Sequence, residues 1–216
     1  MTSEHLRTSL QKYVPADAID ECINWIITHR ISVRIKRSRQ SKFGDYHAPV
    51  KGRNHLITIN HDLNPYAFLI TFTHEVAHLI CFNKHQHRAA PHGAEWKREF
   101  KHLLIPFIYK NIFPNEVKAA LIGYLKDPAA SSCTDLQLQK ALSKFDAVRD
   151  GWLLLEDLQE GTLFAIKNGK KFIKGRKLKK NFECIEVSRN HKYFIYPLME
   201  VMVIESEKSN EMQKSD

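Results

Sequence analysis

The first third of the chain changes from helical to alternating hydrophobic spacing. Apolar residues three and four apart predict a helix over residues 3–14, which Pro15 ends, and a second helix over residues 16–29. Residues 31–36 then alternate apolar and polar side chains, as a half-buried strand does, and residues 56–60 are predicted to form another strand. This part of the chain is therefore predicted to combine helices with a small sheet.

The most apolar helical pattern follows these strands. It carries an N-cap signal at its start, Asn64 followed by Pro65 in the first turn. Its apolar residues recur at helical spacing: Phe68, Leu69, Phe72, Val76 and Leu79. Further helices are predicted from residue 94 to about 107, over 115–125, and over a last segment capped by Thr134.

After Asp150 the pattern changes to short strands. Residues 162–166 and 171–173 flank an Asn-Gly turn, which predicts a β-hairpin. Residues 182–187 and 193–196 predict a second hairpin. Together with a last strand near residues 201–204, this pattern predicts a small barrel or curled sheet. The fold class is α+β, with domains at residues 1–148 and 149–205 and a disordered polar tail over 206–216.

Charge and composition narrow the function classes. The chain has 216 residues, a formal net charge of +9 and a pI of about 9.3. This excess indicates either a polyanionic partner, most simply nucleic acid, or a solvated basic surface. No apolar run reaches the length of a membrane span and no signal peptide is recognised, so we expect a cytoplasmic protein without a membrane partner. The four scattered cysteines are expected to be buried thiols.

Basic residues gather in two places. The first group lies on the outward positions of the strand at residues 31–36 and in the loop after it, and contains Arg34, Lys36, Arg37 and Arg39. The second lies in the β-rich region and contains Lys170, Lys171, Lys174, Arg176, Lys177, Lys179 and Lys180. Both are candidate nucleic-acid-binding residues, because basic groups contact phosphates and nearby aromatic residues such as Phe172 and Phe182 can stack on bases. The alternatives are a charged strand edge for the first group and a solvated hairpin for the second, with both phenylalanines in the core.

The central motif is H-E-x-x-H, formed by His74, Glu75 and His78. Histidines four residues apart lie on one face of a helix, so both imidazoles can bind one ion. Glu75 follows the first histidine and is placed to act as the general base on a water activated by zinc. This pattern is typical of a zinc peptidase.

A catalytic zinc normally takes three protein ligands, so a third is needed. His92 lies at the start of the next predicted helix, where Gly93 permits a sharp turn and Trp96 and Phe100 can pack behind the ligands. The other candidates from this region are His85, His87, Glu95 and Glu99. Spacing alone leaves this choice open.

The strand, the motif helix, the short loop and the His92–Gly93 pair with an aromatic residue after it resemble the SprT-like metallopeptidases over residues 5–110. Related members include the Spartan proteases, which cut proteins crosslinked to DNA. The resemblance implies a zincin-like fold, His74, His78 and His92 as zinc ligands, and Glu75 as general base. Many bacterial members end in a cysteine-pair zinc ribbon, and this chain has none.

The resulting hypothesis is a zinc-dependent endopeptidase that acts on DNA-associated or DNA-crosslinked proteins, with single-stranded or damaged DNA as a partner. The alternatives are a non-catalytic zinc-containing nucleic-acid-binding protein and a general peptidase that does not depend on nucleic acid. Tyr46, His87 and Arg88 are candidate oxyanion donors. Asp45 or Asp62 is a candidate to orient a ligand histidine.

Overall fold

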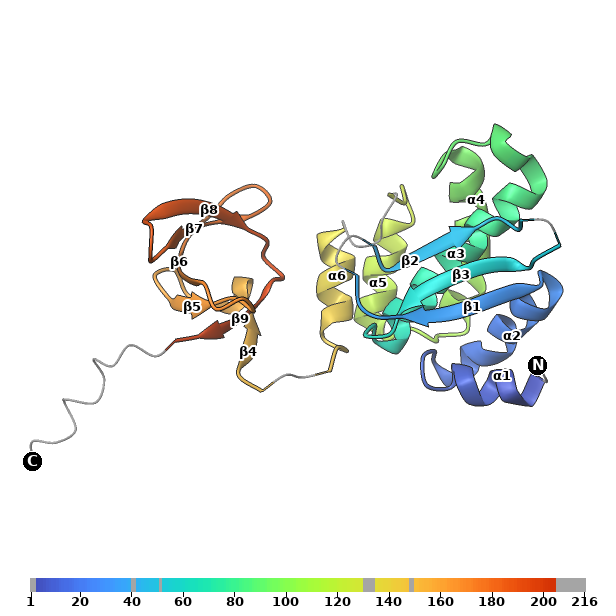
Figure 1. Cartoon of the computed structure of the whole chain (residues 1–216), viewed down its shortest axis with the longest axis horizontal. Helices are drawn as coiled ribbons and strands as arrows, with labels where there is room; N and C mark the ends of the chain where they lie inside the picture. Colours follow the sequence, from blue (N-terminus) through green and yellow to red (C-terminus); the bar gives the residue numbers. More distant parts are fainter. Residues whose placement is uncertain (1–2, 40–41, 51, 130–134, 148–149, 205–216) are drawn as a thin grey trace, which may run out of the picture. The chain divides into compact units, whose positions relative to one another are not determined.

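The structure is a computed structural model that describes residues 3–39, 42–50, 52–129, 135–147 and 150–204. The chain divides into two compact units, residues 1–146 (unit 1) and residues 147–216 (unit 2). Unit 1 combines helices with a small sheet, and unit 2 holds a separate six-stranded sheet (Figure 1). The α+β class predicted from the sequence is confirmed.

Unit 1 begins with two short helices and a three-stranded sheet. Helix α1 (Ser3–Leu10) and helix α2 (Ile19–Thr28, preceded by one 3-10 turn at Ala16–Ala18) place Leu10, Ile23 and Ile26 in the core. Strands β1 (Ile31–Lys36), β2 (Gly44–His47) and β3 (His55–Asn60) follow in the order β1-β3-β2. The β1–β3 pair is parallel and the β2–β3 pair is antiparallel, so β1 and β2 are both edges of this sheet.

Helix α3 (Pro65–His85) is the central element of unit 1. The side chain of Asn64 accepts hydrogen bonds from the backbone N–H groups of Tyr66 and Ala67, and Pro65 occupies the first turn, where its missing N–H costs nothing. Most of the helix is buried, including both motif positions His74 and Glu75. The predicted helix start at Asn64–Pro65 is confirmed.

The remaining helices of unit 1 pack around α3. Helix α4 (Ala94–Tyr109) buries Trp96, Phe100, Leu104 and Phe107. Helix α5 (Asn115–Tyr124) and helix α6 (Leu136–Ser143) complete the unit. Asp135, whose side chain accepts from Leu138 N–H, is the N-cap of α6; Thr134, the predicted cap, lies outside the described residues.

The two faces of the small sheet differ. Ile57 and Ile59 of β3 are fully buried on the face that packs against α3. Thr58 alternates with them and therefore points to the opposite face. Figure 1 draws the sheet in front of α3, with no helix over its near face. We call this near face the open sheet face.

Unit 2 is a curled antiparallel sheet of order β4-β9-β5-β6-β7-β8 (Figure 1). Its strands are β4 (Trp152–Leu154), β5 (Leu163–Ala165), β6 (Lys171–Lys177), β7 (Phe182–Glu186), β8 (His191–Ile195) and β9 (Glu200–Val203). The hairpin with the Asn168–Gly169 turn and the β7–β8 hairpin are confirmed. Strand β4 was not predicted.

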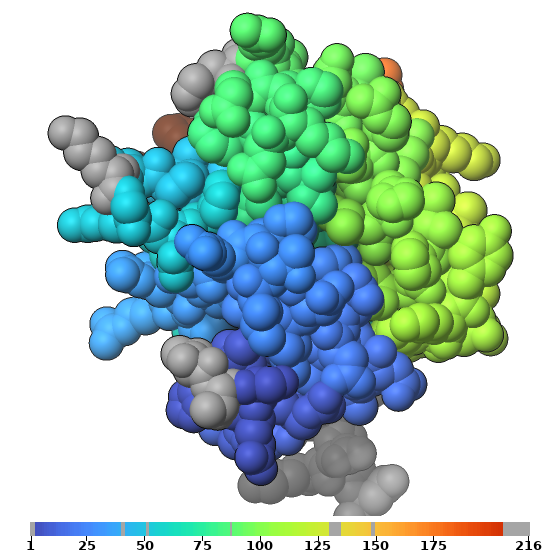
Figure 2. All heavy atoms as spheres, turned by 90° about the vertical axis from the view of Figure 1, so that its right-hand side faces the viewer, coloured from blue at the N-terminus to red at the C-terminus, as the bar shows by residue number. Residues whose placement is uncertain are grey.

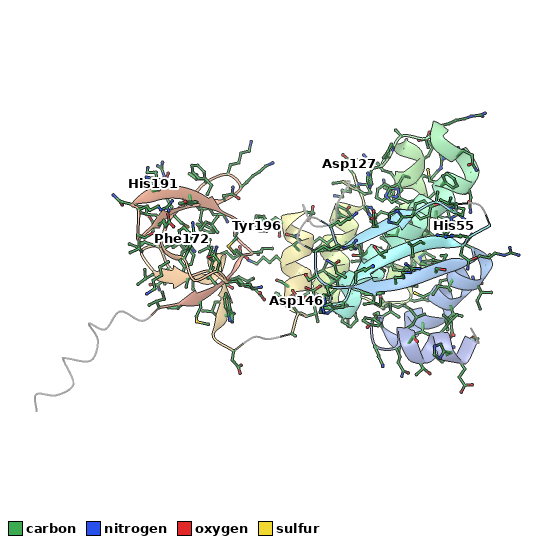
Figure 3. The ribbon with its side chains drawn as sticks, in the orientation of Figure 1. His55, Asp127, Asp146, Phe172, His191 and Tyr196 are labelled. Atoms are coloured by element: carbon green, nitrogen blue, oxygen red, sulfur yellow. The ribbon has the colours of Figure 1, made fainter. Side chains whose placement is uncertain are left out.

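Unit 2 has a core of its own. It contains Phe164, Phe172, Phe182 and Cys184, and Figure 3 shows Phe172 directed into the interior of the sheet. The two phenylalanines considered for base stacking are therefore core residues. Cys22, Cys81 and Cys184 are free and buried as expected, while Cys133 lies outside the described residues. Among the described residues, no helix combines the length and apolar character needed to cross a membrane.

Candidate metal centre

Three histidine side chains converge beside helix α3. The Nε2 atoms of His74 and His78 are 3.2 Å apart, those of His74 and His92 are 3.2 Å apart, and those of His78 and His92 are 2.9 Å apart. His74 and His78 lie one helical turn apart, and His92 reaches them from the loop before α4. Within the described residues, these three side chains form the group that could hold a metal ion.

The geometry of this cluster fits a cation. Three ring nitrogens that face one point cannot satisfy one another by hydrogen bonds, because a neutral imidazole has a single N–H. Tetrahedral zinc with Zn–N bonds of about 2.0–2.1 Å separates its nitrogen ligands by roughly 3.3 Å. The observed separations of 2.9–3.2 Å are close to this value. The three residues can therefore hold one ion on a shared triangle of nitrogens and leave a further position open.

Burial keeps the three imidazoles in the neutral form that a metal requires. Desolvation, followed by the neighbouring histidines His78 and His92, lowers the pKa of His74 to about 2. Desolvation and His92 lower the pKa of His78 to about 4, against a smaller opposing effect of Asp45. Desolvation also lowers the pKa of His92. The ligands are thus unprotonated at neutral pH without a metal.

His92 reaches the cluster through an unusual backbone conformation. Its φ angle is +57°, in the left-handed region, whereas Gly93 has φ −71° and is the N-cap of α4. The expectation that Gly93 makes the sharp turn is therefore wrong: the turn is made at His92 itself. Space at Gly93 is tight, because a Cβ there would lie 3.0 Å from the carbonyl oxygen of Ala90 and would require a shift of a few tenths of an ångström.

Aromatic residues of α4 support the histidines from behind, as predicted. The ring centroid of Trp96 lies 4.5 Å from that of His74, 5.3 Å from that of His78 and 4.7 Å from that of His92. Phe100 stacks on Trp96 at 4.9 Å, and both side chains are fully buried. Trp96 Nε1 donates to the carbonyl oxygen of His74 at 3.4 Å. This packing fixes the rings relative to α3.

Glu75 lies under strand β2. Its carboxylate accepts a hydrogen bond from the backbone N–H of Tyr46, and a Cβ added at Gly44 would be only 2.7 Å from Glu75 Oε1. Desolvation, followed by the charge of Asp45, raises the pKa of Glu75 to about 8, while Lys42, Arg39 and the Tyr46 N–H act in the opposite direction. Gly44 is thus the position that lets β2 approach the carboxylate closely.

The rival third ligands do not join the cluster. Glu99 is buried but forms an ion pair with Lys84, whose Nζ lies 2.9 Å from both carboxylate oxygens. Glu95 is in the first turn of α4, and His85 is the last residue of α3; neither belongs to the metal-ligand group. The side chain of His87 lies outside the described residues.

The other site candidates have different neighbours from those expected. The hydroxyl of Tyr46 contacts His55 Nδ1 at 3.0 Å, so it is engaged away from the histidine cluster. Asp45 is paired with Lys42 and His47 and has no described hydrogen bond to a ligand histidine. Asp62 and Arg88 are exposed. Tyr46 contributes to the site through its backbone N–H.

The basic residues predicted in unit 1 are found on and beside the sheet. Arg34, Lys36 and Arg37 are exposed, and Arg39 is half-buried and bonded to Asn60. Figure 2 shows long side chains of this part of the chain, drawn in light blue to cyan, projecting from one side of unit 1.

The basic residues predicted in unit 2 differ in exposure. Lys174 is a correction: its side chain is 4% exposed, and its ammonium donates to the carbonyl oxygens of Glu156 and Leu158. Strand alternation places it on the same face as Phe172, so it supports the fold and is not available at the surface. The remaining six are exposed: Lys170, Lys171, Arg176, Lys177, Lys179 and Lys180. Phe194 of β8, which lies in the predicted second hairpin, is 61% exposed.

Comparisons with known proteins support the family resemblance that was drawn from the H-E-x-x-H motif. Residues 16–107 match the model of the SprT-like family, a range that contains α2, the sheet, α3 and most of α4 with all three histidines. The resemblance predicted from the motif is therefore confirmed over these residues. Neither the comparison with curated proteins nor the comparison with solved structures found a match.

Proposed function

Residues 16–107 are a SprT-like region, and from this premise we propose that the chain is a zinc-dependent endopeptidase. The observation that carries the proposal is the combination of three converging histidine nitrogens with a buried carboxylate one residue after the first ligand. A site that only stabilises the fold has no use for that carboxylate. Zinc, when bound to His74, His78 and His92, would supply an acidified water and polarise a peptide carbonyl.

The role proposed for Glu75 follows from its surroundings. A general base works best when its pKa lies near the working pH, and burial raises the pKa of Glu75 towards that range. The Tyr46 N–H holds the carboxylate in one orientation. In this role Glu75 accepts a proton from the attacking water and delivers it to the leaving amide nitrogen.

The position of β2 supports an extended peptide as substrate. This strand pairs with β3 on one side, and no described strand pairs with its other side. Its residues Gly44 and Tyr46 lie next to Glu75. A peptide that adds to the free edge of β2 would therefore run beside the catalytic carboxylate.

We further propose that the protein substrates are associated with nucleic acid. The net charge of +9 and the exposed cations of both units support this choice over a general peptidase. The association with nucleic acid would then bring the enzyme to its protein substrate.

The catalytic proposal is tested with Glu75→Gln. This variant removes the base but none of the three histidines, so we expect it to keep its metal and to lose cleavage of an unfolded model protein. Glu95→Gln is the matched control, because Glu95 is a nearby carboxylate outside the cluster, and it should cleave as the wild type does. Wild-type rates in the Glu75→Gln variant would remove Glu75 from the mechanism.

The substrate proposal needs a separate comparison. The same protein is offered free and covalently linked to a single-stranded oligonucleotide, and faster cleavage of the linked form at low salt is expected. Equal cleavage of both forms would favour a general peptidase.

A further inference from the structure

A groove lies along the free edge of strand β1. This edge is opposite to β2, because the strand order of the sheet is β1-β3-β2, and no described strand pairs with the outer side of β1. Figure 1 shows β1 beside α1 and α2. The groove between these elements is lined by residues 31–35 of β1 and has a volume of about 880 Å³, which is within the range of ligand sites. Neither Glu75 nor a histidine of the metal cluster lines it, so it is separate from the candidate metal centre.

The floor of the groove is apolar. The side chains of Val33 and Ile35 point to the helix side of the sheet, because their register partners are the buried Ile57 and Ile59 of β3. The helices cover this side only in part, since Ile35 is 37% exposed and Ile27 of α2 is 56% exposed. The apolar lining includes Leu6, Leu10, Ile26, Ile27, Val33 and Ile35. A partner that covers these side chains would remove apolar surface from water.

The backbone of β1 provides hydrogen-bonding groups at the same edge. An edge strand directs the N–H and C=O groups of alternate residues away from its sheet, where they can pair with an added strand. Apart from the pairing with β3, residues 31–35 have no described backbone hydrogen bond to another part of the chain. The six residues of β1 extend over about 20 Å, so an extended segment of similar length matches this edge.

The charge around the groove is of one sign. Lys12, Arg30 and Arg34 line it and are exposed, and none of the described lining residues is acidic. None of these three cations forms an ion pair with another residue that the structure describes. An anionic partner therefore complements the groove.

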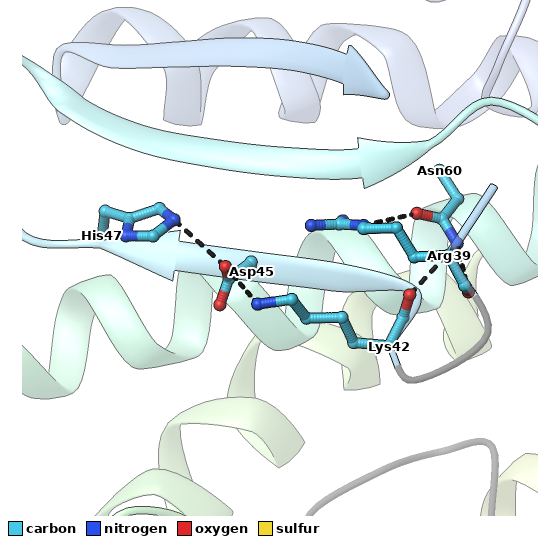
Figure 4. A network of polar contacts seen from close by, with 5 residues as sticks. All are labelled: Arg39, Lys42, Asp45, His47 and Asn60. Carbon is cyan, nitrogen blue, oxygen red and sulfur yellow. Dashed lines mark hydrogen bonds and ion pairs between the residues drawn. The ribbon is translucent and has the colours of Figure 1, made fainter. Parts of the chain in front are cut away.

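Figure 4 shows the contrast with the polar residues beside β2. There, the carboxylate of Asp45 lies 2.5 Å from Lys42 Nζ and 3.1 Å from His47 Nε2. Arg39 Nε donates to Asn60 Oδ1 at 2.9 Å. These side chains already have partners within the chain, so the unpaired cations of the groove are the better contacts for an added acidic group.

The lining favours a polypeptide over a nucleic acid. Tyr13 is the aromatic residue among the described lining residues, and its half-buried ring stacks on Phe68 with 5.1 Å between the centroids. The groove thus has no row of aromatic rings of the kind on which successive bases stack. Aliphatic side chains beside an unpaired strand edge match an extended peptide instead.

We propose that this groove binds an extended, acidic segment of a partner protein, which adds to β1 as a fourth strand of the sheet. Because side chains alternate along a strand, one set of the segment's residues enters the groove and is aliphatic. The other set lies on the open sheet face beside Arg34 and is acidic, and an acidic residue at the end of the segment reaches Arg30, which directly precedes β1. This inference goes beyond the proposed function, since it concerns the edge opposite to β2 and its test needs no proteolysis.

The test uses a fluorescein-labelled, capped hexapeptide of three Ile-Glu pairs. Its binding to the full chain is followed by fluorescence anisotropy, with Glu75→Gln as the parent protein so that the peptide is not cut. We expect saturable binding tighter than about 1 mM. A peptide of three Ile-Lys pairs keeps the apolar side chains and reverses the charge, and it should bind at least about tenfold more weakly.

Backbone N-methylation tests strand addition without any change to the protein. Methyl groups on the three isoleucines block the N–H groups on one side of the peptide strand, and methyl groups on the three glutamates block those on the other side. Only one of these sides can face β1. One methylated peptide should therefore lose at least about tenfold in affinity, while the other stays within about threefold of the unmodified peptide.

Matched variants locate the binding site on the protein. Ile27→Glu puts an acidic group into the groove and should weaken binding about tenfold, whereas Ile105→Glu, at a 43% exposed position of α4 outside the groove, should weaken it less than about twofold. Arg34→Gln should weaken binding about threefold, and Lys36→Gln, at the next position on the same face but outside the lining, less than about twofold. Both glutamate variants should unfold within about 2 °C of the parent, because they change exposed side chains.

Several outcomes would overturn the proposal. They are binding of the Ile-Glu peptide weaker than about 1 mM, equal effects of the two N-methylation patterns, or equal losses in Ile27→Glu and Ile105→Glu. A single-stranded oligonucleotide that displaces the labelled peptide as well as the unlabelled peptide does would assign the groove to nucleic acid. A dimer of the parent that Ile27→Glu dissociates, measured by light scattering, would assign it to a second copy of the chain. Absent proteolysis in the wild type would leave all of these results unchanged, so the two proposals fail separately.

Discussion

Gly44→Ala is the sharpest test of how β2 positions the catalytic carboxylate. A Cβ at this residue would lie 2.7 Å from Glu75 Oε1, 2.9 Å from Glu75 Cγ and 2.8 Å from Thr71 Cγ2. Restoring an ordinary contact of 3.4 Å requires the Glu75 side chain or the strand to move by about 0.7 Å. Because two of the three close atoms lie near the backbone of α3, the carboxylate tip cannot relieve the clash alone.

The expected cost can be estimated from this shift. Misplacement of a catalytic group by about 1 Å can lower the rate about 10²-fold, so we expect kcat/KM to fall by roughly 30- to 100-fold. Overpacking costs about 1–3 kcal/mol, and the lower backbone freedom of alanine in the unfolded chain returns about 0.4–1 kcal/mol. The net loss in the free energy of unfolding is therefore about 1.3 kcal/mol, within a range of about 0–2.6 kcal/mol.

The assay pairs kcat/KM on a fluorogenic protein substrate with urea unfolding and metal analysis. Gly123→Ala is the matched control, since a Cβ at this position in α5 meets nothing within 4 Å. In a helix this change should stabilise by about 0.5–1 kcal/mol and leave kcat/KM unchanged. The reasoning is refuted if Gly44→Ala keeps wild-type kcat/KM within twofold while it remains folded and metal-loaded.

Two further predictions concern stability. When a chelator removes the metal, burial keeps the pKa of His74 at about 2 and that of His78 at about 4 in the folded chain. Below pH 6.5 the same histidines bind protons in the unfolded chain. The free energy of unfolding should therefore decrease as the pH is lowered. The loss should be about 1.6 kcal/mol for each of these histidines between pH 6.5 and 5, measured by urea unfolding; a pH-independent midpoint would contradict it. Lys174→Met leaves the carbonyls of Glu156 and Leu158 without their ammonium donor, and it should destabilise unit 2 by about 2 kcal/mol. The exposed Lys171→Met should stay within about 0.5 kcal/mol in the same thermal unfolding experiment, and equal effects of the two changes would refute the structural role of Lys174.

The sequence contained enough local information for the centre of unit 1. The four-residue spacing of His74 and His78 and the Asn64–Pro65 start are properties of one helix, and periodicity predicts them directly. His92 is different, because it reaches the cluster through a loop and a left-handed backbone. Spacing left Glu95 and Glu99 open, and only tertiary packing shows Glu99 paired with Lys84.

Charged residues were harder to place than apolar ones. Lys174 was predicted to belong to an exposed basic run, although it lies two residues after the buried Phe172 on β6 and the period of two places both side chains on the inward face. Arg39 was predicted to be a surface residue. The contact that half-buries it comes from Asn60, 21 residues further along the chain, and no local pattern reports such a pairing.

Short strands could be predicted where a turn motif joins them but not where their pairing partner is distant in the sequence. Residues 162–166 and 171–173 carry an Asn-Gly turn that specifies their hairpin, and this pairing was predicted. Strand β4 has three residues and pairs with β9, about 50 residues later, so it lacks a local signal.

The central claim is that one zinc ion is held by three histidines, and metal content tests it most directly. Elemental analysis of the purified wild type should give about one zinc per chain. His92→Ala should lose most of it, whereas the control His102→Ala, at an exposed position of α4, should keep it. Full zinc in His92→Ala, or no zinc in the wild type, would contradict the account.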